Sequence, residues 1–187
     1  MLSDSVESIP ELSSKVTTRV ATSADVDNSG IIHAMINEAY RTDKSWATES
    51  HIVSGERITE EALKEIILND KEPFILAELG NSEERKIVGC IRIENLPEPK
   101  EKLLGLFSVD PEHQSKRIGS TLIAAALDIM RSQREERAVI WVIYSRADII
   151  TWYQRLGFYE TEKTEAFPWP HLLIQKDVYF RVFKKDL

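Results

Sequence analysis

The stretch "SVDPEHQSKRIGSTLI" (residues 108–123) combines residue types that suit the binding of an anion. An apolar run ends before Asp110, and residues with helical spacing follow from Gly119. A strand, a short turn and a helix direct several free backbone N–H groups to one point, where the helix dipole adds positive charge. Lys116 and Arg117 strengthen this field, and Gly119 lets a ligand approach the backbone closely. The pattern predicts a phosphate or pyrophosphate site; the alternative is an ordinary strand-to-helix turn with solvated basic side chains.

The composition limits the class of protein. The chain has 187 residues, 42% of them hydrophobic, which suits one domain with a real core. Its single cysteine, Cys90, excludes an internal disulfide and a multi-cysteine zinc site, and the apolar neighbours predict a buried, inert thiol. A net charge of −7 with scattered Lys and Arg argues against a nucleic-acid partner and suits a cationic substrate such as an amine, although solubility alone also explains it.

The sequence carries no sign of export or membrane insertion. "MLSDSVESIPELSS" lacks the basic and apolar regions of a signal peptide, and no apolar run approaches the ~20 residues that span a bilayer. We therefore expect no membrane partner and a cytoplasmic location, with the nucleus as an alternative.

Periodicity and turn residues predict a mixed α/β layer fold in one domain. Residues 1–15 are expected to be a flexible tail and residues 16–187 the domain. Thr22 or Ser23 could cap the first helix, Thr59 caps the second, and Gly157 closes the last. The expected strands are 16–22, 73–79, 86–96, 102–109, 138–144, 158–164 and 177–185, and the expected helices 31–39, 60–68, 119–130 and 147–157.

Two motifs resemble the GNAT superfamily of N-acyltransferases. Residues 109–122 follow the acetyl-CoA signature V-x-P-x-x-[QR]-x-x-G-x-[GA]-x-x-L except that Arg117 replaces its first glycine, and "IITWYQRLGF" (149–158) resembles the family's A-x-x-x-Y-x-x-x-G-F block. "NEAYR", "SGERIT" and "VGCIRIE" resemble a less-characterised branch of the superfamily. The chain has neither a P-loop motif nor G-x-G-x-x-G, and the element order agrees with the family over residues 16–184.

The resemblance implies a GNAT-like acyl-CoA N-acyltransferase fold, with a mixed central sheet of about seven strands flanked by helices. It implies an enzyme that transfers an acetyl group from acetyl-CoA, without a metal, to a primary amine by direct attack in a ternary complex. A small-molecule acceptor is favoured; the alternatives are a protein lysine or N-terminal acetyltransferase acting on a peptide amine, or a degenerate acyl-CoA-binding module. A monomer and a homodimer are both compatible with the sequence.

The resemblance also assigns roles to particular residues. Backbone groups of one strand end would pair with the pantetheine arm of acetyl-CoA, the following loop would hold the pyrophosphate, and Tyr153 would lie beside the sulfur and protonate the leaving thiolate. Because the glycine usual at this position has a positive φ, we expect Arg117 either to alter the loop or to weaken its binding of the pyrophosphate. The implied cofactor-binding residues are Phe107, Ser108, Val109, Gln114, Ser115, Lys116, Arg117, Ile118, Gly119, Ser120, Thr121 and Tyr153.

The general base does not carry over from the family. Many relatives have a glutamate where this chain has Leu103, so Glu94 at the end of the preceding strand is the first substitute and Glu49 the second. A water chain could equally remove the proton, and both glutamates could be solvated surface charges. Arg146 replaces an asparagine that often contacts the cofactor arm. The acceptor pocket could be shaped by Trp46, Trp152 and Trp169; the alternative is packing in the core or at the rim, which is favoured for Trp152.

Overall fold

A computed structural model describes residues 15–80 and 85–187. The expected tail, apart from Lys15, and the centre of the turn between the second and third strands lie outside the described residues.

The described residues form seven strands and four α-helices in the predicted order. The predicted cap of the first helix is wrong, because a 3₁₀ helix, η1 (Ser23–Asn28), precedes α1, which begins at Ser29. Thr59 caps α2 as predicted, by accepting a hydrogen bond from the Ala62 N–H at 3.2 Å. The strands are β1 (Val16–Val20), β2 (Phe74–Gly80), β3 (Arg85–Asn95), β4 (Glu101–Val109), β5 (Arg137–Ile143), β6 (Tyr159–Ala166) and β7 (Tyr179–Asp186). The helices are α1 (Ser29–Arg41), α2 (Glu60–Leu68), α3 (Ile118–Ser132) and α4 (Ala147–Arg155).

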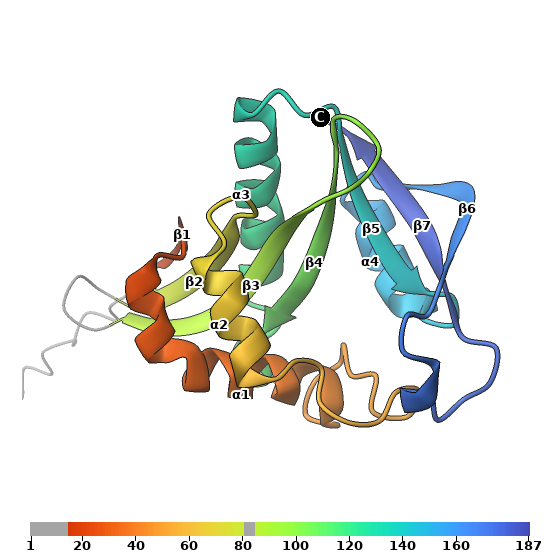
Figure 1. Cartoon of the computed structure of the whole chain (residues 1–187), viewed down its shortest axis with the longest axis horizontal. Coiled ribbons are helices and arrows are strands. Elements are labelled where there is room, and N and C mark those ends of the chain that lie inside the picture. The colour runs from red at the N-terminus through yellow and green to blue at the C-terminus, as the bar shows by residue number, and fades with distance from the viewer. Residues whose placement is uncertain (1–14, 81–84) are drawn as a thin grey trace, which may run out of the picture.

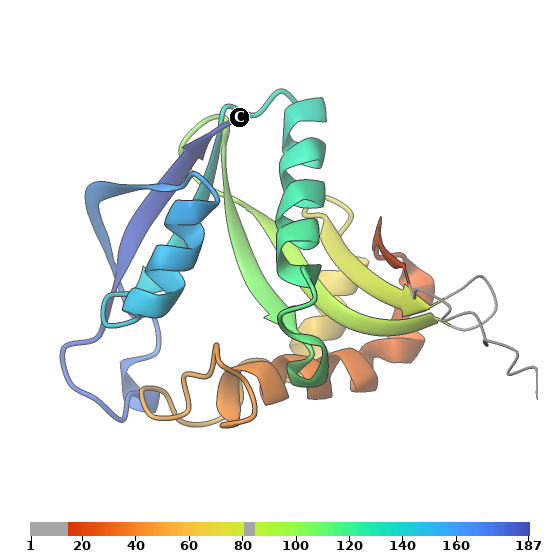
Figure 2. The same ribbon diagram turned by 180° about the vertical axis from the view of Figure 1, so that it is seen from behind.

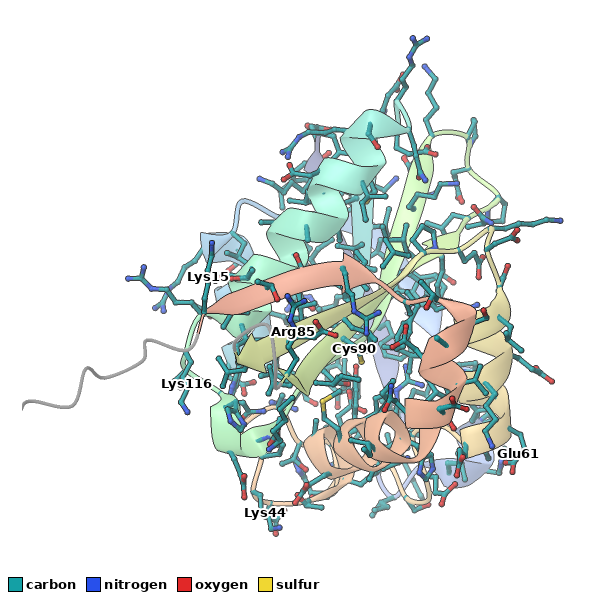
Figure 3. The ribbon with its side chains drawn as sticks, turned by 90° about the vertical axis from the view of Figure 1, so that its left-hand side faces the viewer. Lys15, Lys44, Glu61, Arg85, Cys90 and Lys116 are labelled. Atoms are coloured by element: carbon teal, nitrogen blue, oxygen red, sulfur yellow. The ribbon has the colours of Figure 1, made fainter. Side chains whose placement is uncertain are left out.

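The strands form one mixed sheet in the order β1-β2-β3-β4-β5-β7-β6, with helices on both faces. Helices α1 and α2 cover one face (Figure 1), and α3 and α4 cover the other (Figure 2). Cys90 is fully buried on the α1 side, as expected, and donates to the Leu106 carbonyl at 3.4 Å (Figure 3). Burial raises the pKa of its thiol to about 12, so the thiolate that nucleophilic chemistry needs is suppressed.

The sheet divides between β4 and β5. These parallel strands pair only at Glu101–Arg137, Lys102–Ala138 and Leu103–Val139, and then diverge (Figure 1). The pairing of β3 with β4 is interrupted in the same region, where Leu106 has a φ of 43°. This irregularity has the form of a β-bulge, which bends the strand. The end of β4 from Leu104 to Val109 therefore has no partner strand on its β5 side.

Two connecting segments close the open end of this division. The segment between α1 and α2 lies beside the segment between β6 and β7 (Figures 1 and 2). Ser54 N–H donates to the Leu172 carbonyl at 2.8 Å, and Ile174 N–H donates to the Ile52 carbonyl at 2.9 Å. Ile52 and Val53 pack with Phe167 in a small third core cluster. The two segments thus fix the width of the opening.

A buried ion pair joins the strands at the closed end of the division. Glu101 is 4% exposed and accepts hydrogen bonds from Arg137 at 2.6 Å and Lys184 at 2.6 Å. Burial acts to raise the pKa of Glu101, but the bonds from Lys184 and Arg137 outweigh it and hold that pKa below its usual value. The ion pair therefore links β4, β5 and β7 at the point from which β4 and β5 diverge.

We predict that Glu101→Gln lowers the free energy of unfolding at pH 7 by about 3 kcal/mol, because Lys184 loses its buried counter-charge and Arg137 keeps only the exposed Asp186 at 3.5 Å. A lowered pKa in the folded state stabilises the protein above the unfolded pKa, and this contribution is lost as pH falls through the folded pKa. The difference between variant and wild type should therefore shrink below pH ~4 in urea unfolding curves. Glu136→Gln, which removes an exposed partner of Lys100, is the control and should change little. A difference independent of pH would contradict this account.

Candidate active site

A cavity of about 410 Å³ occupies the division between β4 and β5. Its wall includes the end of β4, the loop before α3, the end of β5 and the inner side of α4. On the α1 side it is lined by Ala39, Tyr40 and residues of the segment Trp46–Glu49. Because α1 and α4 lie on opposite faces of the sheet, the cavity connects the two faces. It could therefore receive one reactant from each side.

The loop predicted to bind phosphate has the conformation of an anion site. Ser115 and Arg117 have φ values of 66° and 63°, and Arg117 is the N-cap of α3. Arg117 thus adopts the left-handed conformation of the glycine it replaces, at some conformational cost. Its carbonyl accepts from the hydroxyl groups of Ser120 and Thr121 at 2.8 and 3.0 Å. The first N–H groups of α3 have no intrahelical acceptor, so they remain able to bind an anion.

The predicted cofactor-binding residues fall into two groups. Lys116 and Thr121 do not line the cavity, and Lys116 extends from the loop into solvent (Figure 3). The structure brings the others together along the cavity wall: Phe107, Ser108, Val109, Gln114, Ser115, Arg117, Ile118, Gly119, Ser120 and Tyr153.

Gly119 has a packing role that the sequence did not reveal. A Cβ atom at this position would lie 3.1 Å from Cζ of Phe107 and 3.5 Å from Cζ2 of Trp152. These two rings stack with their centroids 5.7 Å apart and form part of the cavity wall. A larger residue at 119 would therefore displace this aromatic wall first, rather than only block the approach of a ligand.

The segment Ser45–Glu49 is held across the cavity by two residues that approach it from opposite directions. Gln114 donates to Ser45 Oγ at 2.8 Å and accepts from the Trp46 N–H at 3.3 Å. The guanidinium of Arg146, which is 7% exposed, donates to the carbonyls of Trp46 and Ala47 at 3.0 and 3.1 Å. Arg146 stands where relatives often have an asparagine that contacts the cofactor arm, but here its guanidinium holds the segment Ser45–Glu49. Sequence reasoning missed this structural role.

Two phenols lie in the cavity wall. Tyr153 is 7% exposed, and its hydroxyl forms no hydrogen bond within the described residues. Burial, with a smaller contribution from Tyr40, raises its pKa well above the usual value, so the phenol keeps its proton. Tyr40 donates to the carbonyl of Phe107 at 3.2 Å, and burial raises its pKa to about 12 against the opposing charge of Arg57. Sequence reasoning gave Tyr40 no role, although it belongs to the "NEAYR" motif.

The two candidate bases occupy different environments. Glu94 pairs with Leu103 across the β3–β4 ladder, beside the position where relatives carry their glutamate. Its carboxylate extends over Gly105, where a Cβ atom would lie 1.8 Å from Glu94 Oε1, so this glycine provides the space for it. Burial raises the pKa of Glu94, partly offset by Arg92 at 3.6 Å. Glu94 does not line the cavity; Glu49 does, but it forms an ion pair with Arg41 at 3.3 Å.

Comparison with known proteins identifies the family. The chain matches the acetyltransferase (GNAT) family over residues 21–158, which is more than half of its length, and it belongs to that family. A search of curated protein sequences found no match. Within the described residues, no helix is both long and apolar enough to cross a membrane.

Solved structures share the fold at low sequence identity. The ribosomal-protein-alanine N-acetyltransferase from Brucella melitensis has a TM-score of 0.66 at 19% identity, covering 91% of this chain and 99% of its own. The PaiA N-acetyltransferase from Thermoplasma acidophilum, in complex with coenzyme A, has a TM-score of 0.66 at 17% identity, and the match covers 92% of this chain and 99% of that protein. The ribosomal-protein-S18-alanine N-acetyltransferase from Escherichia coli has a TM-score of 0.63 at 15% identity, and the match covers 92% of this chain and 94% of that protein.

We predict that Arg146→Met loosens the segment Ser45–Glu49. The substitution removes the charged donors of several main-chain carbonyls, which should lower the free energy of unfolding by about 2–3 kcal/mol and speed amide hydrogen exchange in that segment. Arg155→Met, an exposed arginine of α4, is the matched control and should change neither quantity. Unchanged exchange in the Arg146 variant would show that other contacts hold the segment.

Proposed function

We propose that the protein is an acetyl-CoA-dependent N-acetyltransferase that acetylates a primary amine by direct attack in a ternary complex. One observation carries the proposal: a single cavity runs through the sheet, from the loop with positive-φ residues before α3 to Tyr40 on the α1 side. Such a passage lets an acyl donor and an amine meet without a covalent enzyme intermediate. The buried, high-pKa Cys90 makes a thiol-mediated alternative unattractive.

The residues present fit acetyl-CoA. The N–H groups at the start of α3 would hold the pyrophosphate, and Lys116 adds positive charge nearby. The β5-facing edge of Phe107–Val109 would pair with the pantetheine amides, as an added strand does. Phe107 and Trp152 provide an apolar wall for the arm between them. Bound acetyl-CoA supplies the activated acetyl thioester.

The chemistry then depends on positioning and proton transfer. A free alkylammonium has a pKa of about 10.4 and no lone pair, so a base must first take a proton from the amine. A main-chain N–H near the end of β4 would polarise the thioester carbonyl. The C–N bond forms, the C–S bond breaks, and Tyr153 protonates the departing thiolate. The net reaction converts ammonium and thioester to amide, thiol and one released proton.

Glu94 remains our first choice for the base and Glu49 the second. A raised pKa suits Glu94 to accept a proton near neutral pH, and a water molecule would connect it to the cavity. Glu49 lines the cavity, but its carboxylate is already engaged in the ion pair with Arg41.

We favour a small-molecule acceptor and a cytoplasmic monomer or homodimer. The Brucella and Escherichia relatives are named for acetylating alanine of ribosomal proteins, so a protein acceptor is the second candidate. A module that binds acyl-CoA without turnover is the third.

Calorimetric titration with acetyl-CoA, followed by measurement of free thiol released with a panel of amines, tests the proposal. We expect binding and amine-dependent thiol release. Tyr153→Phe should retain acetyl-CoA binding and lower kcat by about 10²-fold or more, because the variant lacks the acid. Tyr144→Phe is the control and should change neither quantity, because Tyr144 stacks on Tyr179 and does not line the cavity. Binding without release across small amines and peptides would favour the binding module, and absence of binding would refute the proposal.

The pH dependence identifies the base. Because burial raises the pKa of Glu94, kcat/KM corrected for the free-amine fraction should rise with pH through a midpoint above that of an exposed glutamate, about 4.3. Glu94→Gln should remove this rise and lower kcat/KM by about 10²-fold or more. Glu49→Gln should keep the rise. The opposite result would assign the base to Glu49, and an unchanged profile in both variants would assign it to water.

A further inference from the structure

Arg57 contacts two aromatic rings next to the cavity; of these three residues only Tyr40 lines the cavity itself. Its Cζ atom is 5.0 Å from the centroid of the Tyr40 ring and 5.9 Å from that of Trp169. Tyr40 lines the cavity on the α1 side, whereas Trp169 belongs to the segment between β6 and β7. Arg57 itself precedes α2, so its guanidinium lies where the two closing segments meet. This is the side of the sheet from which an amine would enter.

Arg57 differs from comparable arginines in lacking a carboxylate partner. In residues 15–80 and 85–187, every other arginine that is buried or half-buried forms an ion pair with an Asp or Glu. No carboxylate of the described residues lies within ion-pairing distance of Arg57. Withdrawing a cation from water without a counter-charge is unfavourable, and a bound anion would offset that cost. The paired arginines are Arg19, Arg41, Arg92, Arg137, Arg146 and Arg181.

We propose that the acceptor is an amine that also carries a carboxylate, such as an amino acid, and that Arg57 binds this carboxylate. The inference rests on the proposed function and specifies its substrate class. The Arg57 side chain interacts with the Tyr40 hydroxyl, but a guanidinium has five N–H donors in one plane, so others remain available to a ligand. That planar set of donors matches a carboxylate, which accepts two parallel hydrogen bonds. Arg57 thus acts as a specificity-determining residue.

Glu94 provides the opposite charge on the same face of the sheet. Burial raises the pKa of Glu94, and Arg92 and more weakly Arg57 oppose this rise, so the charge of Arg57 is felt at the Glu94 carboxyl group. Glu94 and Arg57 therefore present a carboxylate and a guanidinium in one region, and an amino acid carries an ammonium and a carboxylate. This complementarity distinguishes a zwitterionic acceptor from a polyamine, whose second cation would meet Arg57 unfavourably.

Matched pairs of acceptors test the inference with the full chain and saturating acetyl-CoA. Each L-amino acid is compared with its own carboxamide, which keeps the side chain and the amine but removes the negative charge. We expect kcat/KM, from thiol release, to be at least about tenfold higher for the acids. At pH 7 a larger fraction of each carboxamide than of each acid is present as the free amine, because the ammonium group of the carboxamide has the lower pKa. A preference for the acids therefore cannot come from the supply of free amine.

Variants of Arg57 separate recognition from packing. Arg57→Gln should abolish the preference for acids by lowering kcat/KM at least about tenfold more for the acids than for the carboxamides, while Arg57→Lys should retain part of the preference. Arg134→Gln, an exposed arginine beyond the end of α3, is the control and should keep the wild-type preference. If Arg57 serves only to stack on Tyr40 and Trp169, its loss would reduce both kcat/KM values equally, and this result would overturn the inference.

Two outcomes distinguish this inference from the proposed function. Acetylation of uncharged amines with no preference for acids would overturn the inference alone. Absence of thiol release with every amine, amino acid and peptide tested, despite acetyl-CoA binding, would overturn both. A second readout is calorimetric binding of the same acids and carboxamides to the complex with coenzyme A, where only the acids should bind and Arg57→Gln should bind neither.

Discussion

The brief pairing of β4 with β5 is the constraint on which the rest of the site depends. Three residue pairs hold the strands together at the end secured by Glu101, and beyond them the strands diverge. Divergence leaves the end of β4 without a partner strand on that side, and side chains take the place of a strand at two of its carbonyls: Tyr40 donates to Phe107 and Gln114 to Val109. A ligand with amide groups could pair with this strand edge. The same gap opens a passage between the two faces of the sheet, so in the proposed reaction one structural feature would provide both the binding edge and the place where the reactants meet.

Contacts between segments far apart in the sequence fix the width of the opening between β4 and β5. The bridge between Val53 and Leu173 ties the segments at the open end, and Gln114 and Arg146 hold the segment Ser45–Glu49 across the cavity. Arg57, between Tyr40 and Trp169, adds an interaction between the same two closing segments. Reacting atoms must be held within a few tenths of an ångström, and these crosslinks restrict the motion of the loops that would contact them.

Burial determines the protonation states around the cavity. Desolvation raises the pKa values of Tyr153, Tyr40, Cys90 and Glu94 because each charged form is the one penalised. The effect has different consequences for each group. Tyr153 remains a proton donor and Cys90 remains an inert thiol, whereas Glu94 is brought closer to the neutral range in which a carboxylate can act as a base. Burial therefore affects all four groups in the same direction, but it suits Tyr153 to the proposed role of acid and Glu94 to the proposed role of base, and it leaves Cys90 unreactive.

The sequence by itself determined the element order, the buried Cys90, the cap at Thr59 and the family, because hydrophobic periodicity and short motifs are local properties of the chain. It also identified most residues that line the cavity. It could not reveal that Arg146 and Gln114 hold a segment about 70 to 100 residues away, that Gly119 faces Phe107 and Trp152, or that Glu94 extends over Gly105. It gave Tyr40 and Arg57 no role. These facts depend on strand register and on loops brought together in space, and only the tertiary structure decides which distant side chains meet.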